Sequence, residues 1–187
     1  MSGNRLQELE KAPLFKAKTL NGDTLDLGQL YGHKVLLVFF RYATCPLCNL
    51  RAEELRREYE SLRRDYIVIG VFQSDPEYIR EYIGSRGIPF PIIPDPEGDL
   101  YRMYGVEHSW WKLWLGFRRV KTVFNAFFRN GWRPGPVDGV ISRIPADFLI
   151  DEFGRLMLCH YGSDITDHVP LARLSERLEE DRILGLA

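Results

Sequence analysis

The stretch KVLLVFFRYATCPLC, residues 34–48, decides the fold, because it joins a continuous apolar run to two cysteines three residues apart. The run Lys34–Phe40 is partly β-branched, as expected of a strand buried on both faces. Pro46 suits the first turn of a helix, so the pattern predicts a helix over 46–64 with Cys45 at its N-cap. Apolar positions recur along that helix every three or four residues: Cys48, Ala52, Leu55, Tyr59 and Leu62.

The rest of the chain alternates strand and helix signals. Residues 14–27 predict a hairpin around Asn21-Gly22-Asp23. After it we expect a strand at 66–72, a helix at 76–85 capped by Asp75, an edge strand within 87–98, two strands over 148–162 and a helix over 170–184. This order predicts one domain over 1–187, a three-layer α/β fold with a mixed sheet flanked by helices.

Composition narrows the class of protein. The 187 residues are 45% hydrophobic and 27% charged with a net charge of −1, so nucleic acid is not expected as a partner. The longest apolar run is far shorter than the roughly 20 residues of a membrane helix, and residues 1–13 lack the apolar region of a secretory signal. With only three cysteines, a reducing, cytoplasmic location is expected, where a CxxC pair is catalytic or metal-binding.

The position of the pair predicts its chemistry. A thiolate at Cys45 would face free backbone N–H groups and the positive end of the helix dipole, which lower a cysteine pKa. Cys48, one turn further, would be sheltered yet within bonding reach, as thiol–disulfide exchange requires. Two other interpretations are open: small residues at a helix start, or a zinc half-site. Only Cys159 and His160 offer further zinc ligands, so a metal carrier using Cys45, Cys48 and His160 is the weakest hypothesis, and no cofactor is expected.

Two longer segments resemble a known family. APLFKAKTLNGDTLDLGQLYGHKVLLVFFRYATCPLC and IPADFLIDEFGRLMLCHYG resemble the peroxiredoxin-like branch, alkyl hydroperoxide reductase and thiol-specific antioxidant, of the thioredoxin-fold superfamily. The resemblance covers residues 12–106 and 143–180. It implies a thioredoxin-like fold, with Pro145 as a cis-proline whose loop faces the cysteine pair.

The resemblance leaves the attacking cysteine open. The family motif PxxxTxxC is not reproduced: aligning Cys48 with its cysteine puts Arg41 and Cys45 at the Pro and Thr positions, and the family's active-site Arg falls on Pro145. Arg41 or Arg143 could take that role. Cys48 would then be the peroxidatic cysteine, whereas in a thioredoxin-like enzyme Cys45 attacks. The N-cap position favours Cys45. Thr44 would bind a thiolate or cap the helix.

An insert at 108–142 precedes the second of these segments. Residues 108–137 hold six basic residues and no acidic one, and the spacing of their apolar residues predicts an aromatic stripe along a helix: Trp110, Leu113, Trp114, Phe117, Val120, Phe124 and Phe127. The helix could add core or a homodimer surface, form a substrate lid through Trp110, Trp114 and Phe117, or lie on a membrane surface.

The sequence therefore predicts a peroxiredoxin-like thiol oxidoreductase that cycles Cys45 and Cys48 between dithiol and disulfide. Its substrates would be disulfides or peroxides, in an antioxidant role, and its reductant an external thiol of the thioredoxin or glutathione type. One alternative is a true hydroperoxide reductase with Cys48 as the peroxidatic cysteine. The other is a non-catalytic binding module that presents the 108–137 helix.

Overall fold

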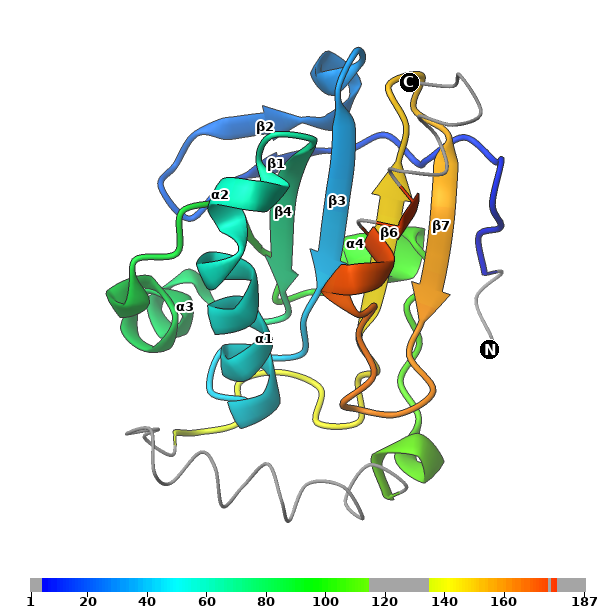
Figure 1. Cartoon of the computed structure of the whole chain (residues 1–187). Coiled ribbons are helices and arrows are strands. Elements are labelled where there is room, and N and C mark those ends of the chain that lie inside the picture. Colours follow the sequence, from blue (N-terminus) through cyan, green and yellow to red (C-terminus); the bar gives the residue numbers. More distant parts are fainter. Residues whose placement is uncertain (1–4, 115–134, 175, 178–187) are drawn as a thin grey trace.

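The computed structural model describes residues 5–114, 135–174, 176 and 177, and its centre is a mixed five-stranded sheet (Figure 1). The strand order is β5-β4-β3-β6-β7, in which β3, β4 and β5 are parallel and β6 and β7 run antiparallel to their neighbours. The strands are β3 (Lys34–Phe39), β4 (Tyr66–Phe72), β5 (Ile92–Pro94), β6 (Ala146–Ile150) and β7 (Leu156–Tyr161). The predicted mixed sheet is confirmed.

Two apolar clusters cover the two faces of this sheet and make the three layers. Alternate residues of β3 enter opposite clusters: Leu36 and Val38 on one face, Leu37 and Phe39 on the other. The first face packs against α1 (Pro46–Arg57), α2 (Tyr59–Leu62), α3 (Pro76–Tyr82) and the helical turn at 171–174; the second packs against α4 (Asp99–Met103). Because both faces are covered, β3 is apolar at successive positions, as predicted.

The predicted hairpin forms a separate two-stranded sheet of β1 (Lys16–Lys18) and β2 (Thr24–Asp26). Gly22 in its turn has φ +91°, a conformation that only glycine adopts without strain. Phe15 and Leu27 at the two ends of the hairpin lie in the second apolar cluster, which holds the hairpin against the domain.

The single helix predicted over 46–64 is wrong in its length. It ends at Arg57, and Glu58, with φ −90° and ψ 3°, separates α1 from the short α2. The apolar positions nevertheless stay on the core side: Cys48, Ala52, Leu55 and Leu62 are buried, and Tyr59 is partly buried against them. The break therefore changes the path of the backbone without changing the face that packs.

Three other helices differ in extent from the predicted ones or were not predicted. The helix at 76–85 becomes α3 followed by a 3-10 turn at Gly84–Arg86, and Asp75 occupies its N-cap without a side-chain hydrogen bond. The unpredicted α4 begins where the Asp95 carboxylate accepts hydrogen bonds from the backbone N–H groups of Asp99 and Leu100, at 3.0 and 2.8 Å. The helix predicted over 170–184 is helical at 171–174, 176 and 177, and its remaining residues lie outside the described structure.

The first turns of the insert helix are described at residues 110–114, and 115–134 lie outside the described residues. Leu113 is buried with Ile144 and Ile165 against the domain. Trp110, Trp111 and Trp114 are 67, 80 and 72% exposed, so the two tryptophans of the predicted stripe face solvent, while Leu113 packs on the domain. No helix in the described part of the chain is long and apolar enough to span a bilayer.

Candidate functional site

The cysteine pair lies at the junction between the end of β3 and the start of α1, as the sequence predicts. Cys45 is the N-cap of α1, with φ −66° and ψ 122°, and Pro46 occupies the first helical turn. Both thiols are free, and Cys45 and Cys48 are 0 and 2% exposed. The pair is thus a reduced dithiol beneath the protein surface.

Two side chains that sequence reasoning missed hold the turn before the helix. The Asn49 amide donates hydrogen bonds to the carbonyls of Ala43 and Cys45, at 2.7 and 2.9 Å. The Ala43 N–H donates to the Ser74 hydroxyl at 2.7 Å. Asn49 is 1% exposed and Ser74 fully buried, and both belong to residue types that satisfy backbone groups at helix starts and turns. Together they keep Cys45 at the end of the helix axis.

Arg41 supplies the positive charge of the site. Its Nη1 donates to Cys45 Sγ at 3.5 Å, and its backbone N–H donates to Cys48 Sγ at 3.2 Å. The guanidinium also donates to the Ile141 carbonyl and lies over the Tyr42 ring, 5.3 Å from the ring centre. Arg41 is 3% exposed, so its charge acts on the sulfur through little solvent.

These contacts give the two thiols opposite acidities. Burial acts to raise the pKa of Cys45, but the hydrogen bond from Cys48, the charge of Arg41 and the backbone N–H groups of Leu47 and Cys48 together lower it to about 6. Burial and the neighbouring Cys45 thiolate raise the pKa of Cys48 well above its ordinary value. Cys45 is therefore ionised at neutral pH while Cys48 keeps its proton.

The other predicted supporting residues do not contact the sulfurs in the described hydrogen bonds. The Thr44 hydroxyl donates to the Pro136 carbonyl at 2.8 Å. The Arg143 guanidinium donates to Gln73 Oε1 at 2.9 Å and to the Val106 carbonyl at 2.8 Å. Of the two candidate arginines, Arg41 is the one that reaches the thiols.

The prediction that Pro145 is a cis-proline is wrong. None of the described peptide bonds is cis, so the bond before Pro145 is trans. Residues before it pair with 107–109, since Ser109 N–H donates to the Ser142 carbonyl and Ile144 N–H to that of Glu107, at 2.8 and 3.2 Å. After it, the Pro145 carbonyl accepts a hydrogen bond from Gly162 N–H at 2.9 Å. This pairing carries the chain into β6 with the ordinary trans geometry, which X–Pro bonds prefer by about 0.5–1 kcal/mol.

The segment 135–142, which we call the strap, packs against the residues that precede α1. It receives the hydrogen bonds from Thr44 and Arg41 described above, through the carbonyls of Pro136 and Ile141. The predicted lid residues Trp110 and Trp114 instead point largely to solvent, and Phe117 lies outside the described residues.

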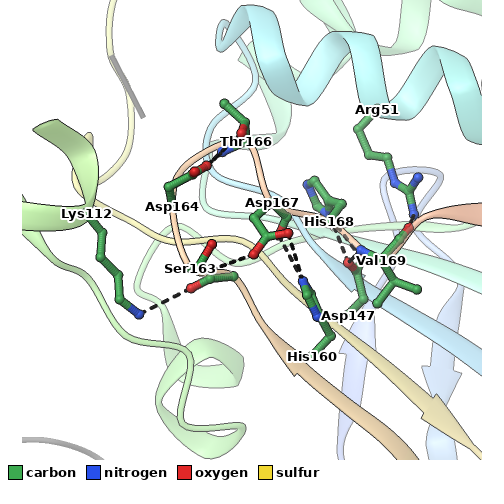
Figure 2. A network of polar contacts seen from close by, with 11 residues as sticks. Arg51, Lys112, Asp147, His160, Ser163, Asp164, Thr166, Asp167, His168 and Val169 are labelled. Carbon is green, nitrogen blue, oxygen red and sulfur yellow. Dashed lines mark hydrogen bonds and ion pairs between the residues drawn. The ribbon is translucent and has the colours of Figure 1, made fainter. Parts of the chain in front are cut away.

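Asp147 and His168 form a buried hydrogen-bonded pair (Figure 2). The pair lies on the same face of the sheet as the cysteines, because Leu149, two residues further along β6, packs in the apolar cluster that holds Cys45 and Cys48. Asp147 of β6 is fully buried, and its carboxylate contacts His168 Nδ1 at 3.0 and 3.1 Å and accepts a hydrogen bond from Val169 N–H at 2.7 Å. Arg51 of α1 donates to the Val169 carbonyl at 2.7 Å. Burial acts to raise the pKa of Asp147, but His168, Arg51 and the Val169 N–H together lower it. The group ties α1, β6 and the loop at 162–169 together.

Replacing His168 by leucine is expected to lower the free energy of unfolding by about 3 kcal/mol, because it leaves the buried Asp147 carboxylate without the hydrogen bond from the imidazole. His33→Leu, the same change at an exposed histidine, is the control and is expected to change it by less than about 0.5 kcal/mol. Urea denaturation at pH 7 measures both. Since the pKa of Asp147 is lowered on folding, the wild type should lose this stability as the pH falls below about 4, the ordinary value for aspartate. Equal losses in the two variants would contradict the prediction.

The metal hypothesis gains no support from geometry. His160 Nε2 contacts the carboxylate of Asp167 at 3.4 Å, within the loop that follows β7. Among the described residues no group of three His, Cys, Asp or Glu is placed to hold a metal ion, so Cys45, Cys48 and His160 do not converge. Cys159 is partly buried on the second face of the sheet, and burial raises its pKa to about 12.

Comparison with known proteins places the chain in a family. The family model AhpC/TSA matches residues 9–158. Peroxiredoxin Bcp of Bacillus subtilis is 27% identical over 161 residues, covering 86% of this chain and 88% of that protein. Peroxiredoxin Bcp of Escherichia coli is 25% identical over 149 residues, 78% and 88% of the two chains.

Solved structures share the fold. The thiol peroxidase of Chromobacterium violaceum superposes with a TM-score of 0.67 at 14% identity, covering 96% of this chain and 90% of the other. Peroxidoxin BcpB of Mycobacterium tuberculosis gives 0.66 at 14% identity, covering 96% and 98%. The chain therefore belongs to the AhpC/TSA family and is a peroxiredoxin-like protein of thioredoxin-like fold.

Proposed function

We propose that this AhpC/TSA protein is a thiol-dependent oxidoreductase in which Cys45 attacks and Cys48 resolves. The observation that carries the assignment is the opposite acidity of the two thiols, with a pKa of about 6 at Cys45 and a strongly raised one at Cys48. The thiolate is the nucleophile in thiol exchange and in peroxide reduction. At pH 7 about 90% of Cys45 would be ionised.

With a peroxide, the Cys45 thiolate forms an S–O bond as the O–O bond breaks, and an alcohol or water leaves after taking up a proton. The Cys48 thiol then attacks the Cys45 sulfenic acid, water leaves, and the Cys45–Cys48 disulfide forms. With a disulfide substrate, Cys45 forms a mixed disulfide that Cys48 resolves, releasing the reduced substrate. Either cycle closes when an external dithiol, or two molecules of a monothiol, reduces the pair and is itself oxidised. Arg41, at 3.5 Å from Cys45 Sγ, would stabilise the thiolate before each attack.

The test is the mass and free-thiol count of the reduced protein after one equivalent of hydrogen peroxide, tert-butyl hydroperoxide or a small disulfide. Loss of two hydrogens within seconds with a peroxide would identify a peroxidase. Slow reaction with both peroxides but immediate oxidation by the disulfide would identify an exchange enzyme. If none of the reagents forms the Cys45–Cys48 disulfide, the proposed function fails, and the alternative of a binding module takes its place.

The reverse assignment, with Cys48 as the peroxidatic cysteine, is a second candidate within the same scaffold. What favours it is the hydrogen bond from the Arg41 backbone N–H to Cys48 Sγ at 3.2 Å, which would stabilise a thiolate there. The raised pKa of Cys48 argues against it.

The remaining parts of the proposal concern partners. We expect a reductant of the thioredoxin or glutathione type and a cytoplasmic location. The exposure of Trp110, Trp111 and Trp114 supports an intermolecular contact of the 110–114 helix, for which a homodimer is our first candidate and a membrane surface the second. The homodimer is tested by measuring the molar mass of the wild type and of a Trp111→Ser variant by light scattering after size-exclusion chromatography.

A further inference from the structure

Phe40 lies between the paired part of β3 and the cysteine pair. β3 ends at Phe39, which pairs with Val71 on one side and with Ala146 on the other. The Phe40 N–H still donates to the Val71 carbonyl at 2.9 Å. No backbone N–H of the described residues donates to the Phe40 carbonyl, which instead accepts a hydrogen bond from the Tyr101 hydroxyl at 2.6 Å. Tyr101 therefore replaces the sheet partner that this carbonyl lacks.

The Phe40 carbonyl and the Arg41 N–H belong to one peptide group, which connects Tyr101 to Cys48. The N–H donates to Cys48 Sγ at 3.2 Å. Because a peptide group is planar, a hydrogen bond that fixes its carbonyl also fixes the direction of its N–H. A carbonyl that accepts a hydrogen bond also makes the N–H of the same group a stronger donor. The Tyr101 hydroxyl thus acts on Cys48 Sγ through a single peptide group.

Tyr101 reaches this peptide from the other side of the sheet. It belongs to α4 and is fully buried in the second apolar cluster, whereas Cys48 lies in the first. Its ring packs edge-on against Phe39, with ring centres 5.0 Å apart, and the Arg143 guanidinium lies 4.8 Å from the ring centre. Burial raises the pKa of Tyr101 well above its ordinary value, so the hydroxyl keeps its proton and remains a donor. The charge of Arg143 acts in the opposite direction and strengthens the hydrogen bond that the hydroxyl donates.

We infer that Tyr101 is a positioning residue for Cys48: its hydroxyl holds the Phe40–Arg41 peptide with the N–H directed at Cys48 Sγ, where it stabilises the Cys48 thiolate in the second step of the cycle. The inference rests on the proposed function in taking Cys48 as the resolving cysteine. In that step Cys48 loses its proton and forms the S–S bond to Cys45. The sulfenic acid oxygen leaves as water, or the substrate sulfur leaves as a thiol after taking up a proton.

The Arg41 N–H matters most after Cys45 has reacted. In the reduced pair, burial together with the hydrogen bond and the negative charge of Cys45 raises the pKa of Cys48. The first step consumes the Cys45 thiolate. Burial is then opposed by the charge of Arg41 and by its backbone N–H, both of which lower the pKa of Cys48. Removing the Tyr101 hydroxyl should therefore slow the second step and leave the first nearly unchanged.

The test is the titration of Cys48 in Cys45→Ala, which has no Cys45 thiolate and needs no turnover. In protein labelled with ¹³C at cysteine Cβ, the chemical shift of Cys48 reports its ionisation. Adding Tyr101→Phe leaves the Phe40 carbonyl buried without its hydrogen bond. We expect the pKa of Cys48 to rise by about one unit, which is about tenfold less thiolate at a given pH.

Single-turnover kinetics measures the consequence in the protein with both cysteines. After one equivalent of oxidant, Tyr101→Phe should form the Cys45–Cys48 disulfide about threefold more slowly than the wild type. The loss is smaller than the loss of thiolate because the more basic thiolate is also more nucleophilic. The first step should change less than about twofold.

Tyr104→Phe is the matched control. Tyr104 follows α4, is fully buried in the same apolar cluster and donates to the Pro13 carbonyl at 2.8 Å, away from the cysteines. Urea denaturation should show a comparable loss of stability in Tyr104→Phe and Tyr101→Phe, but only Tyr101→Phe should move the titration of Cys48. Equal shifts of that titration in the two variants, or no shift in Tyr101→Phe, would overturn the inference.

If Tyr101→Phe does not fold, Cys45→Ala alone still decides. The amide proton of Arg41 and the ¹³Cζ resonance of Tyr101 should move with the midpoint of the Cys48 titration, whereas the ¹³Cζ resonance of Tyr104 should not. An Arg41 amide proton that stays in place while Cys48 ionises would also overturn the inference. A failure of the proposed oxidoreductase function would show separately, as the absence of a Cys45–Cys48 disulfide in the oxidised wild type.

Discussion

Replacing Cys45 by serine is expected to lower the rate of substrate reduction at least about 10³-fold, because the serine hydroxyl is not ionised near neutral pH and cannot replace a thiolate nucleophile. Cys48→Ser should keep the first step and lose the second. After one equivalent of oxidant, its Cys45 should stay as a sulfenic acid with a peroxide, or as a mixed disulfide with a disulfide substrate. Stopped-flow kinetics with intact-mass analysis measures both steps.

Cys159→Ser is the matched control, and it is expected to change the rate less than about twofold, since Cys159 lies on the other face of the sheet. The reverse pattern, in which Cys45→Ser traps a sulfenic acid and Cys48→Ser does not react, would contradict the assignment. It would establish Cys48 as the peroxidatic cysteine.

Replacing Arg41 by methionine is expected to slow the first step at pH 7 about tenfold. The variant loses the positive charge 3.5 Å from Cys45 Sγ, so the pKa of Cys45 should rise from about 6 toward the ordinary value of about 8.5. The thiolate fraction at pH 7 falls accordingly, and the greater intrinsic nucleophilicity of a more basic thiolate offsets part of the loss. The difference in rate between Arg41→Met and the wild type should therefore become smaller as the pH rises to 9, because the variant thiol then also ionises. Absorbance at 240 nm against pH measures the shift.

Arg41→Lys keeps the charge and should recover part of the rate, whereas Arg63→Met, at an exposed arginine beyond α2, should leave it unchanged. A Cys45 titration that does not move in Arg41→Met would mean that the helix terminus and Cys48 alone set the acidity. In that case the role of Arg41 would be to hold residues 135–142 through the Ile141 carbonyl, rather than to stabilise the thiolate.

Much of the fold could be predicted because its signals are local. The run Lys34–Phe40 became a strand with successive residues in opposite apolar clusters, and Pro46 placed the helix start within one residue. The α4 helix was missed because it has five residues and no periodic stripe, although Asp95 before it is a cap signal. The end of α1 at Arg57 was missed because the apolar spacing continues unbroken through Tyr59 and Leu62.

The candidate site was predictable in part. The CxxC at the strand-to-helix junction indicated both cysteines and the N-cap position of Cys45, since these depend on neighbours in the chain. Choosing between Arg41 and Arg143 was not possible, because it depends on where two guanidinium groups point after folding. Arg51 lies outside the apolar spacing of its helix, yet it is 6% exposed and reaches the Val169 carbonyl, 118 residues away along the chain.

By itself, then, the sequence determined the order of strands and helices, the mixed sheet and the dithiol at the N-terminus of α1. Each of these follows from hydrophobic spacing and from backbone preferences over a few residues. Only the tertiary structure decided which arginine meets Cys45, that Asp147 and His168 pair on the face of the sheet that α1 covers, and that residues 135–142 receive hydrogen bonds from Arg41 and Thr44. The physical reason is that the free energy of a buried charge depends on the groups that folding brings next to it. The separation of two groups along the chain does not determine the distance between them in space.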